Sequence, residues 1–170
     1  MIAPRARVPE ESRSDARHAA RLAAVQAIYQ MELSGADAEE VIQEFLDHRF
    51  GHEAELSPGK PDEEFFASIV RGVPHHQVEI DRAVASGLAQ GWKLQRIDSI
   101  LRAILRAGTC ELIARPDVPA RVVIDEYMDI SHAFFSADEP AFVNAVLDKL
   151  AHRKRAAEFG ETPPDDELQF

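Results

Sequence analysis

The chain has 170 residues, of which 45% are hydrophobic and 29% charged, and its formal net charge is −11 at pH 7. This length suits one domain, or two small subdomains that share a core. The negative charge argues against non-specific coating of nucleic acid, and no apolar run approaches the roughly 20 residues that a membrane helix needs.

The sequence begins with a Pro- and Arg-rich segment, residues 1–13, which lacks hydrophobic periodicity and is expected to be a flexible basic arm. It contains no apolar stretch typical of a secretory signal, so we expect a cytoplasmic protein. Five arginines and three carboxylates give residues 1–30 a net charge of +2, which leaves −13 on the other 140 residues. This distribution permits one local anion site near the N-terminus.

Seven segments after this arm show the apolar periodicity of amphipathic helices. The predicted helices span about residues 14–33, 37–48, 62–73, 76–88, 94–114, 119–134 and 139–152. Asp37 and Asp62 can cap the helices that follow them, Gly35 ends the first helix, and Pro74 interrupts the third. Gly108 in the most hydrophobic helix costs about 1 kcal/mol relative to alanine, which a close helix crossing would explain.

No stretch alternates apolar and polar residues as a half-buried strand would, so the chain is expected to be all-α. One helical domain is predicted over residues 14–152. The charged tail, residues 153–170, is expected to be disordered.

The last predicted helix contains the sequence FVNAVLDKL, residues 142–150, entered through SADEP. Ser136 and Glu139 have the spacing of a capping box, and Pro140 suits a first helical turn. The free N–H groups of such a helix start can bind phosphate, which Asp138 would oppose by its charge. Phe142 has two candidate roles, packing inward or stacking on a base.

The chemistry of the chain does not support an enzyme. Seven histidines include His48 and His52, four residues apart, but Gly51 between them makes a zinc pair improbable. No nucleotide-binding glycine loop and no nucleophile motif is present. Cys110, the single cysteine, excludes a disulfide framework and lies in an apolar helix, where packing is the simpler role. No metal, cofactor or catalytic residue is predicted.

Two pairs of arginines remain as candidate binding residues. Arg17 and Arg21 are four residues apart and share one face of the first helix, with Tyr29 farther along. Cations and an aromatic ring suit phosphate contact and base stacking on single-stranded RNA. The residues alone also allow the alternative of solvated arginines and a core tyrosine. Arg102 and Arg106 form a second pair with the same ambiguity.

Four segments in register carry a resemblance to a known family. They are ARLAAVQAIYQMEL (20–33), ILRAILRAGTCELI (100–113), RPDVPARVVIDEYMDISHAF (115–134) and FVNAVLDKL (142–150). In this order and spacing they resemble the NusB family of transcription antitermination factors, in a form similar to the alphaproteobacterial members. The resemblance covers roughly residues 15–152.

The resemblance implies an all-helical fold of two small three-helix-like subdomains packed across each other, here about residues 14–90 and 91–152. It implies no catalytic activity and no cofactor. It also implies binding to the boxA element of ribosomal RNA transcripts, together with the ribosomal protein NusE, in an antitermination complex with RNA polymerase. Whether the chain also forms a homodimer is left open.

By matching positions, the resemblance assigns RNA binding to a set of residues at the first and last helices. They are Arg17, His18, Arg21, Tyr29, Asp138 and Phe142. Arg13 is added as a further RNA contact that could compensate, from the basic arm, for the thinned arginine cluster. Arg102 and Arg106 are assigned to partner binding. Two other hypotheses are an acidic helical module that binds a basic partner without touching RNA, and a methyltransferase. The latter requires a cofactor-binding domain for which this chain has no room.

Overall fold

The computed structural model describes residues 10–50 and 61–164, and this part of the chain is helical without strands, as predicted. The α-helices are α1 (Glu10–Ser34), α2 (Ala38–Glu44), α4 (Glu63–His75), α5 (Gln77–Gly87), α6 (Ser99–Ala114), α7 (Ala120–Phe134) and α8 (Glu139–Lys154). A π-helical turn follows α2, and short 3-10 turns precede α6 and follow α8. None of these helices is long and apolar enough to cross a membrane.

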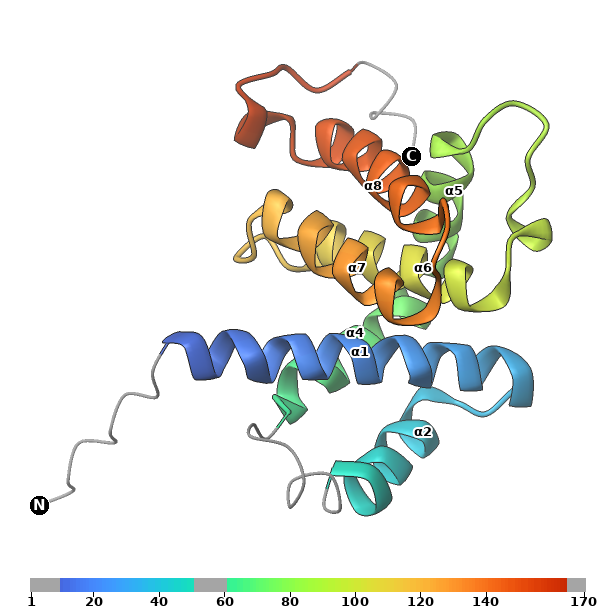
Figure 1. Cartoon of the computed structure of the whole chain (residues 1–170), viewed down its shortest axis with the longest axis vertical. Coiled ribbons are helices and arrows are strands. Elements are labelled where there is room, and N and C mark those ends of the chain that lie inside the picture. The colour runs from blue at the N-terminus through green and yellow to red at the C-terminus, as the bar shows by residue number, and fades with distance from the viewer. Residues whose placement is uncertain (1–9, 51–60, 165–170) are drawn as a thin grey trace, which may run out of the picture.

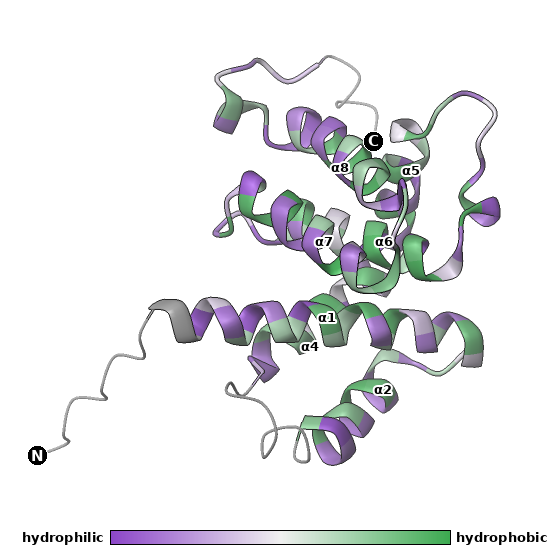
Figure 2. Ribbon diagram, viewed as in Figure 1, coloured by the Kyte–Doolittle hydropathy of each residue, from purple (hydrophilic) through white to green (hydrophobic). Residues whose placement is uncertain are grey.

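Helix α6 is the centre of the packing. It contacts α1, α4, α5, α7 and α8, and Figure 2 shows it hydrophobic over most of its length. In Figure 1, α1 crosses the molecule with α2 on one side and α6, α7 and α8 on the other. Because α5 packs mainly against α6 and α8, the two groups of helices meet at His76, between α4 and α5, and not near residue 90 as predicted.

The helix ends follow the capping residues that the sequence provides. Asp37 accepts a hydrogen bond from the Glu40 amide, and Asp62 accepts one from the Phe65 amide, at 2.9 and 3.0 Å. Both caps were predicted. Gly35 stops α1 with a φ of +73°, a conformation that favours glycine.

Two helix starts and one cap differ from the predictions. Helix α1 begins at Glu10, so Ser14 lies inside the helix, and residues 1–9 of the predicted arm lie outside the described residues. Helix α6 begins at Ser99, because Asp98 caps it and a 3-10 turn replaces its predicted first turn. The capping box at Ser136 does not form, since α8 begins at Glu139. Pro140 does lie at the start of this helix.

The C-terminal segment contradicts the expectation of a disordered tail from residue 153. Helix α8 continues to Lys154, and a 3-10 turn follows at Ala156–Phe159. The Arg155 guanidinium donates hydrogen bonds to the backbone oxygens of Leu112, Arg115 and Val118, at 2.7, 2.7 and 3.0 Å. Glu158 accepts one from the Ala120 amide. The segment therefore fastens the connection between α6 and α7; residues 165–170 lie outside the described residues.

The predicted close crossing at Gly108 is confirmed. A Cβ atom at this position of α6 would lie 2.9 Å from a methyl carbon of Leu147 on α8. The absence of a side chain therefore lets the two helices approach, which offsets the helix-propensity cost of glycine.

Candidate nucleic-acid interface

Helix α1 carries Arg17 and Arg21 on one face, as the spacing predicts, but only one of them reaches the surface. Arg21 is 2% exposed, and it donates two hydrogen bonds to Glu111 on α6, at 2.8 and 3.0 Å. Glu126 on α7 lies 3.5 Å from the same guanidinium. Arg21 is therefore engaged by carboxylates inside the protein, and RNA binding by Arg21 stays a prediction.

The buried Glu111 also sets the protonation of its neighbours. Burial lowers the pKa of Arg21, but the hydrogen bond and negative charge of Glu111 outweigh this, so the pKa is raised. Burial and Glu111 together raise the pKa of Tyr127 well above its ordinary value. The core therefore holds a charged Arg21–Glu111 pair beside a neutral phenol.

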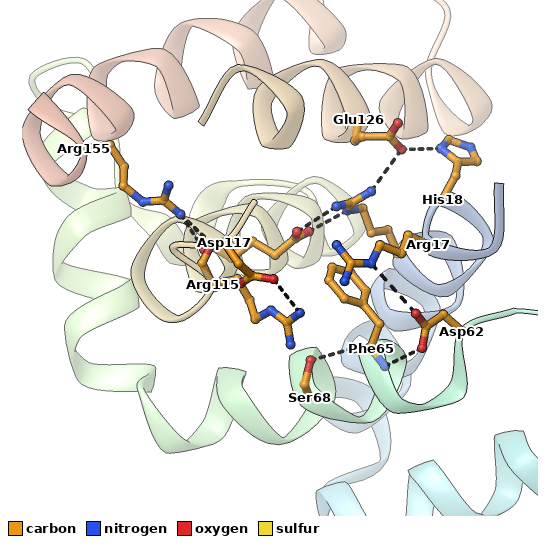
Figure 3. A network of polar contacts seen from close by, with 11 residues as sticks. Arg17, His18, Asp62, Phe65, Ser68, Arg115, Asp117, Glu126 and Arg155 are labelled. Atoms are coloured by element: carbon orange, nitrogen blue, oxygen red, sulfur yellow. Dashed lines mark hydrogen bonds and ion pairs between the residues drawn. The ribbon is translucent and has the colours of Figure 1, made fainter. Parts of the chain in front are cut away.

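Arg17 lies one turn before Arg21, at the rim of this site. Its side chain is 37% exposed, and its nearest carboxylate is Asp62 at 3.9 Å. Arg115, which follows α6, approaches from the other side and donates a 3.0 Å hydrogen bond to Asp117. Figure 3 shows Arg17 and Arg115 on either side of Phe65. We call Arg17, Arg21 and Arg115, together with Phe65, the arginine cluster.

The three guanidinium groups share one aromatic partner. The guanidinium carbons of Arg17, Arg21 and Arg115 lie 4.7, 4.9 and 4.9 Å from the centroid of the Phe65 ring. Cation–π attraction at such distances contributes about 0.5–2 kcal/mol each, more where water is excluded. Phe65 itself is buried, so the cluster is fixed to the core.

The other two residues predicted near the start of α1 differ in their surroundings. His18 binds Glu126 of α7 through Nδ1 at 2.7 Å, and its Nε2 lies 3.6 Å from Asp129. Arg13 is exposed in the first part of α1. His18 is therefore held against α7, whereas Arg13 stands at the surface.

Tyr29 lies farther along α1, half-buried against the core. It lines a surface hollow with Val25 and Leu33 of the same helix, Ile100 of α6 and Phe134 of α7. Leu33 is 64% exposed. Tyr29 therefore both packs and presents an edge, which combines the two alternatives that its sequence position allowed.

A second hollow lies at the start of α8. Asp138, Phe142, Leu101 and Trp92 line this groove of about 460 Å³, which we call the aromatic groove. The rings of Trp92 and Phe142 are tilted, with centroids 6.5 Å apart, and Trp92 is 61% exposed. Leu101 follows directly after Ile100, so the hollow at Tyr29 and the aromatic groove adjoin at the start of α6.

The predicted partner-binding pair, Arg102 and Arg106, is engaged inside the molecule, and partner binding by these residues stays a prediction. Arg102 pairs with Glu32 of α1 and donates to the backbone oxygen of Ile97 at 2.8 Å. Arg106 pairs with Asp81 of α5 at 3.0 Å. Both arginines join α6 to its neighbours and are nearly covered.

The described residues contain no group of three or more histidine, cysteine or acidic side chains that could hold a metal ion. Cys110 is buried in α6, and burial together with Glu111 raises its pKa to about 12. The thiol is therefore protonated and packs against Gly72 of α4.

Arg115 and Trp92 are site residues that the sequence did not reveal. Arg115 belongs to the segment ARPDVP, which was interpreted only as a tight connection, and Trp92 was interpreted only as a corner. A large aromatic residue in a polar turn was the available signal for Trp92. Arg115 gave no such signal, since Phe65 lies on another helix.

An all-helical chain with a cationic rim at one place and exposed aromatic rings at another has the features of a nucleic-acid-binding factor. The NusB family model matches residues 18–152, and the chain belongs to this family. Its members are transcription antitermination factors and not enzymes.

The relatives agree with this assignment. The transcription antitermination protein NusB of Maricaulis maris (strain MCS10) is 51% identical over 152 residues, which cover 89% of this chain and 95% of the relative. NusB of T. maritima is similar in structure, with a TM-score of 0.68, 28% identity, and coverage of 91% of this chain and 97% of that one. A chain from the crystal structure of the antitermination factors NusB and NusE in complex with double-stranded RNA shares the fold, with a TM-score of 0.65, 24% identity and coverage of 84% and 97%.

Proposed function

We propose that this transcription antitermination protein binds the boxA element of ribosomal RNA transcripts directly, as a heterodimer with NusE. The observation that carries the proposal is the presence of two kinds of group: the exposed Arg13 and partly exposed Arg17 at the start of α1, and the exposed Trp92 ring beside the half-buried Phe142 ring in the aromatic groove. The first type of group contacts phosphates, and the second stacks on unpaired bases.

The distance between the arginine cluster and the aromatic groove suits an extended RNA strand. Arg115 follows the last residue of α6, whereas Leu101 of the aromatic groove lies near its beginning. At 1.5 Å per residue, about 21 Å of helix separate them. Tyr29 lines the hollow that adjoins the groove. RNA that contacted Arg13 and Arg17 would pass Tyr29 before it reached Asp138, Phe142 and Trp92.

The charge of the chain supports a shared site. A net charge of −11 repels RNA at long range, and the exposed cations at the start of α1 are few. A basic partner would be attracted to the acidic body and would supply further positive surface for RNA. NusE fits this role, because the complex described above contains a chain of this fold together with NusE and RNA. Assembly on RNA polymerase in the cytoplasm completes the proposed function.

A second candidate function is a protein-interaction module that carries the partner without touching RNA. The observation that favours it is that two of the predicted RNA contacts already have protein partners, Arg21 with Glu111 and His18 with Glu126. In that case only the partner would contact boxA.

Fluorescence anisotropy with a labelled boxA RNA tests the proposal. We expect the heterodimer to bind more tightly than this chain or NusE alone. Replacing Trp92 and Phe142 by alanine should weaken binding by the heterodimer. Equal affinity of NusE with and without this chain would contradict direct RNA binding.

A further inference from the structure

The arginine cluster has a feature that buried ion pairing does not explain. Three guanidinium groups lie within 5 Å of the same ring centroid, although only Arg21 has a bidentate carboxylate partner. Arg17 of α1 and Arg115, which follows α6, both place their guanidinium groups against Phe65 (Figure 3). Like charges brought this close repel each other, so an anion that bridged them would be stabilised.

We propose that Arg115 works with Arg17 as a two-arginine clamp on the RNA backbone, with Phe65 as the shared surface that positions both guanidinium groups. This proposal rests on the proposed function, because it names a further contact for the same RNA. It assigns a role in RNA binding to Arg115, in addition to its place in the connection between α6 and α7.

Both arginines have hydrogen-bond donors to spare. A guanidinium group carries five N–H donors. The 3.9 Å ion pair of Arg17 with Asp62 is too long for a hydrogen bond, and no other acceptor for Arg17 lies among the described residues. Arg115 gives one N–H to Asp117, while its buried Nε has no acceptor in the described part of the chain. An incoming phosphate oxygen would satisfy donors that the protein leaves unused.

The position of Arg115 is fixed before any ligand arrives. Arg155 donates a 2.7 Å hydrogen bond to the Arg115 backbone oxygen, and Phe65 packs against the Arg115 guanidinium. The guanidinium carbons of Arg17 and Arg115 lie 4.7 and 4.9 Å from the Phe65 centroid. The distance between these two carbons therefore cannot exceed the sum of these values. A preorganised pair loses less side-chain entropy on binding than two mobile arginines would.

Two carboxylates hold the clamp when RNA is absent. Asp62 is committed to capping α4, because it accepts the Phe65 amide at 3.0 Å. Asp117 is exposed and lies in the field of both arginines. Burial acts to raise the pKa of Asp117, but the hydrogen bond from Arg115 and the charges of Arg115 and Arg17 together have the larger, opposite effect. The pKa is therefore lowered overall, and the carboxylate stays ionised. Asp117 therefore competes with phosphate for Arg115.

The test compares Arg115→Gln and Asp117→Asn in the heterodimer with NusE, by anisotropy with a boxA RNA at several salt concentrations. Loss of one phosphate contact should flatten the slope of log K against log salt by about 0.7 and weaken binding about fourfold near 0.15 M salt. Asp117→Asn should tighten binding by about threefold, on the same scale. Arg115→Lys keeps the charge and should keep the slope.

A matched control and a folding measurement make the result decisive. Arg82→Gln removes the same charge from an exposed site on α5 and should leave affinity and slope close to the wild-type values. Thermal unfolding followed by circular dichroism confirms that each variant is folded. If Arg17→Gln weakens binding while Arg115→Gln and Asp117→Asn have no effect, the clamp is overturned and the proposed function stands. If the wild-type heterodimer fails to bind boxA RNA, that result contradicts the proposed function itself, on which the clamp rests.

Discussion

The arginine cluster and the aromatic groove are built in opposite ways. In the cluster the charged groups are held by the core, with Arg21 fully committed to Glu111 and Phe65 hidden beneath three cations. In the groove Trp92 is largely exposed to solvent, and its ring partner within the described part of the chain is Phe142. In the first region carboxylates and the Phe65 ring already engage the cations and so stabilise the fold, whereas the second region keeps its binding groups exposed.

This difference assigns different physical roles to the two regions. Contacts by arginine to phosphate depend on counterion release and weaken with salt, while stacking on an aromatic ring is nearly independent of it. We therefore expect the arginine cluster to govern the salt dependence of RNA binding. The aromatic groove should govern the affinity that remains at high salt.

The largest expected effect is on stability and concerns the buried side of the arginine cluster. Glu111→Gln removes the bidentate carboxylate partner of the buried Arg21 and leaves only the 3.5 Å contact with Glu126 among the carboxylates described above, which should lower the free energy of unfolding by about 3–5 kcal/mol in urea titrations. Arg21→Met combined with Glu111→Leu should recover much of this loss. If that double variant folds but binds RNA as poorly as Arg17→Gln, then Arg21 belongs to the binding site after all.

The next effect concerns the aromatic groove. Trp92→Ala should weaken RNA binding by about 1–3 kcal/mol, the range for one stacked base, without changing the salt slope. Anisotropy at several salt concentrations measures both quantities. Val78→Ala is the matched control, because Val78 is an exposed apolar residue on α5. A flatter salt slope in Trp92→Ala would contradict the assignment of the salt dependence to the arginine cluster.

A smaller effect is expected from the exposed side of the arginine cluster. Arg17→Gln should weaken binding about fourfold near 0.15 M salt and flatten the salt slope by about 0.7. Its stability should fall by no more than the cation–π contribution of about 0.5–2 kcal/mol, because its ion pair with Asp62 is long and partly exposed to solvent. An unchanged slope would remove Arg17 from the RNA contacts.

The smallest effect concerns the C-terminal segment, which holds the Arg115 backbone. His152 binds Glu161 at 2.9 Å and stacks on Phe159. The hydrogen bond that His152 donates to the Glu161 carboxylate is the main cause that raises the pKa of His152. A raised histidine pKa stabilises the fold fully below the ordinary value of about 6.5 and loses that stabilisation as pH rises through the folded value.

Thermal unfolding between about pH 6 and about pH 8 should therefore show a slight decline in the melting temperature that His152→Gln reduces. His132→Gln, at an exposed position on α7, is the control. An identical pH dependence in wild type and His152→Gln would mean that the Glu161 contact contributes nothing.

The features that local sequence could predict were the helical class, the Asp37 and Asp62 caps, and the Gly108 crossing. The helical class and the caps depend on neighbours within one or two turns, and the crossing could be predicted because a glycine within an apolar helix is itself a local signal. The burial of Arg21 could not be predicted, because i, i+4 spacing shows that two residues share a face of a helix but not whether that face is buried. Its partner Glu111 is 90 residues away in sequence. The pairing of Arg102 with Glu32 of α1 could not be predicted for the same reason.

Mapping of RNA crosslinks in the heterodimer with boxA RNA tests the central claim most directly. The account predicts that photoreactive bases crosslink to this chain at or beside Trp92, Phe142 or Tyr29, as identified by mass spectrometry of the peptides. Crosslinks found only on NusE would contradict direct RNA binding and would favour the interaction module.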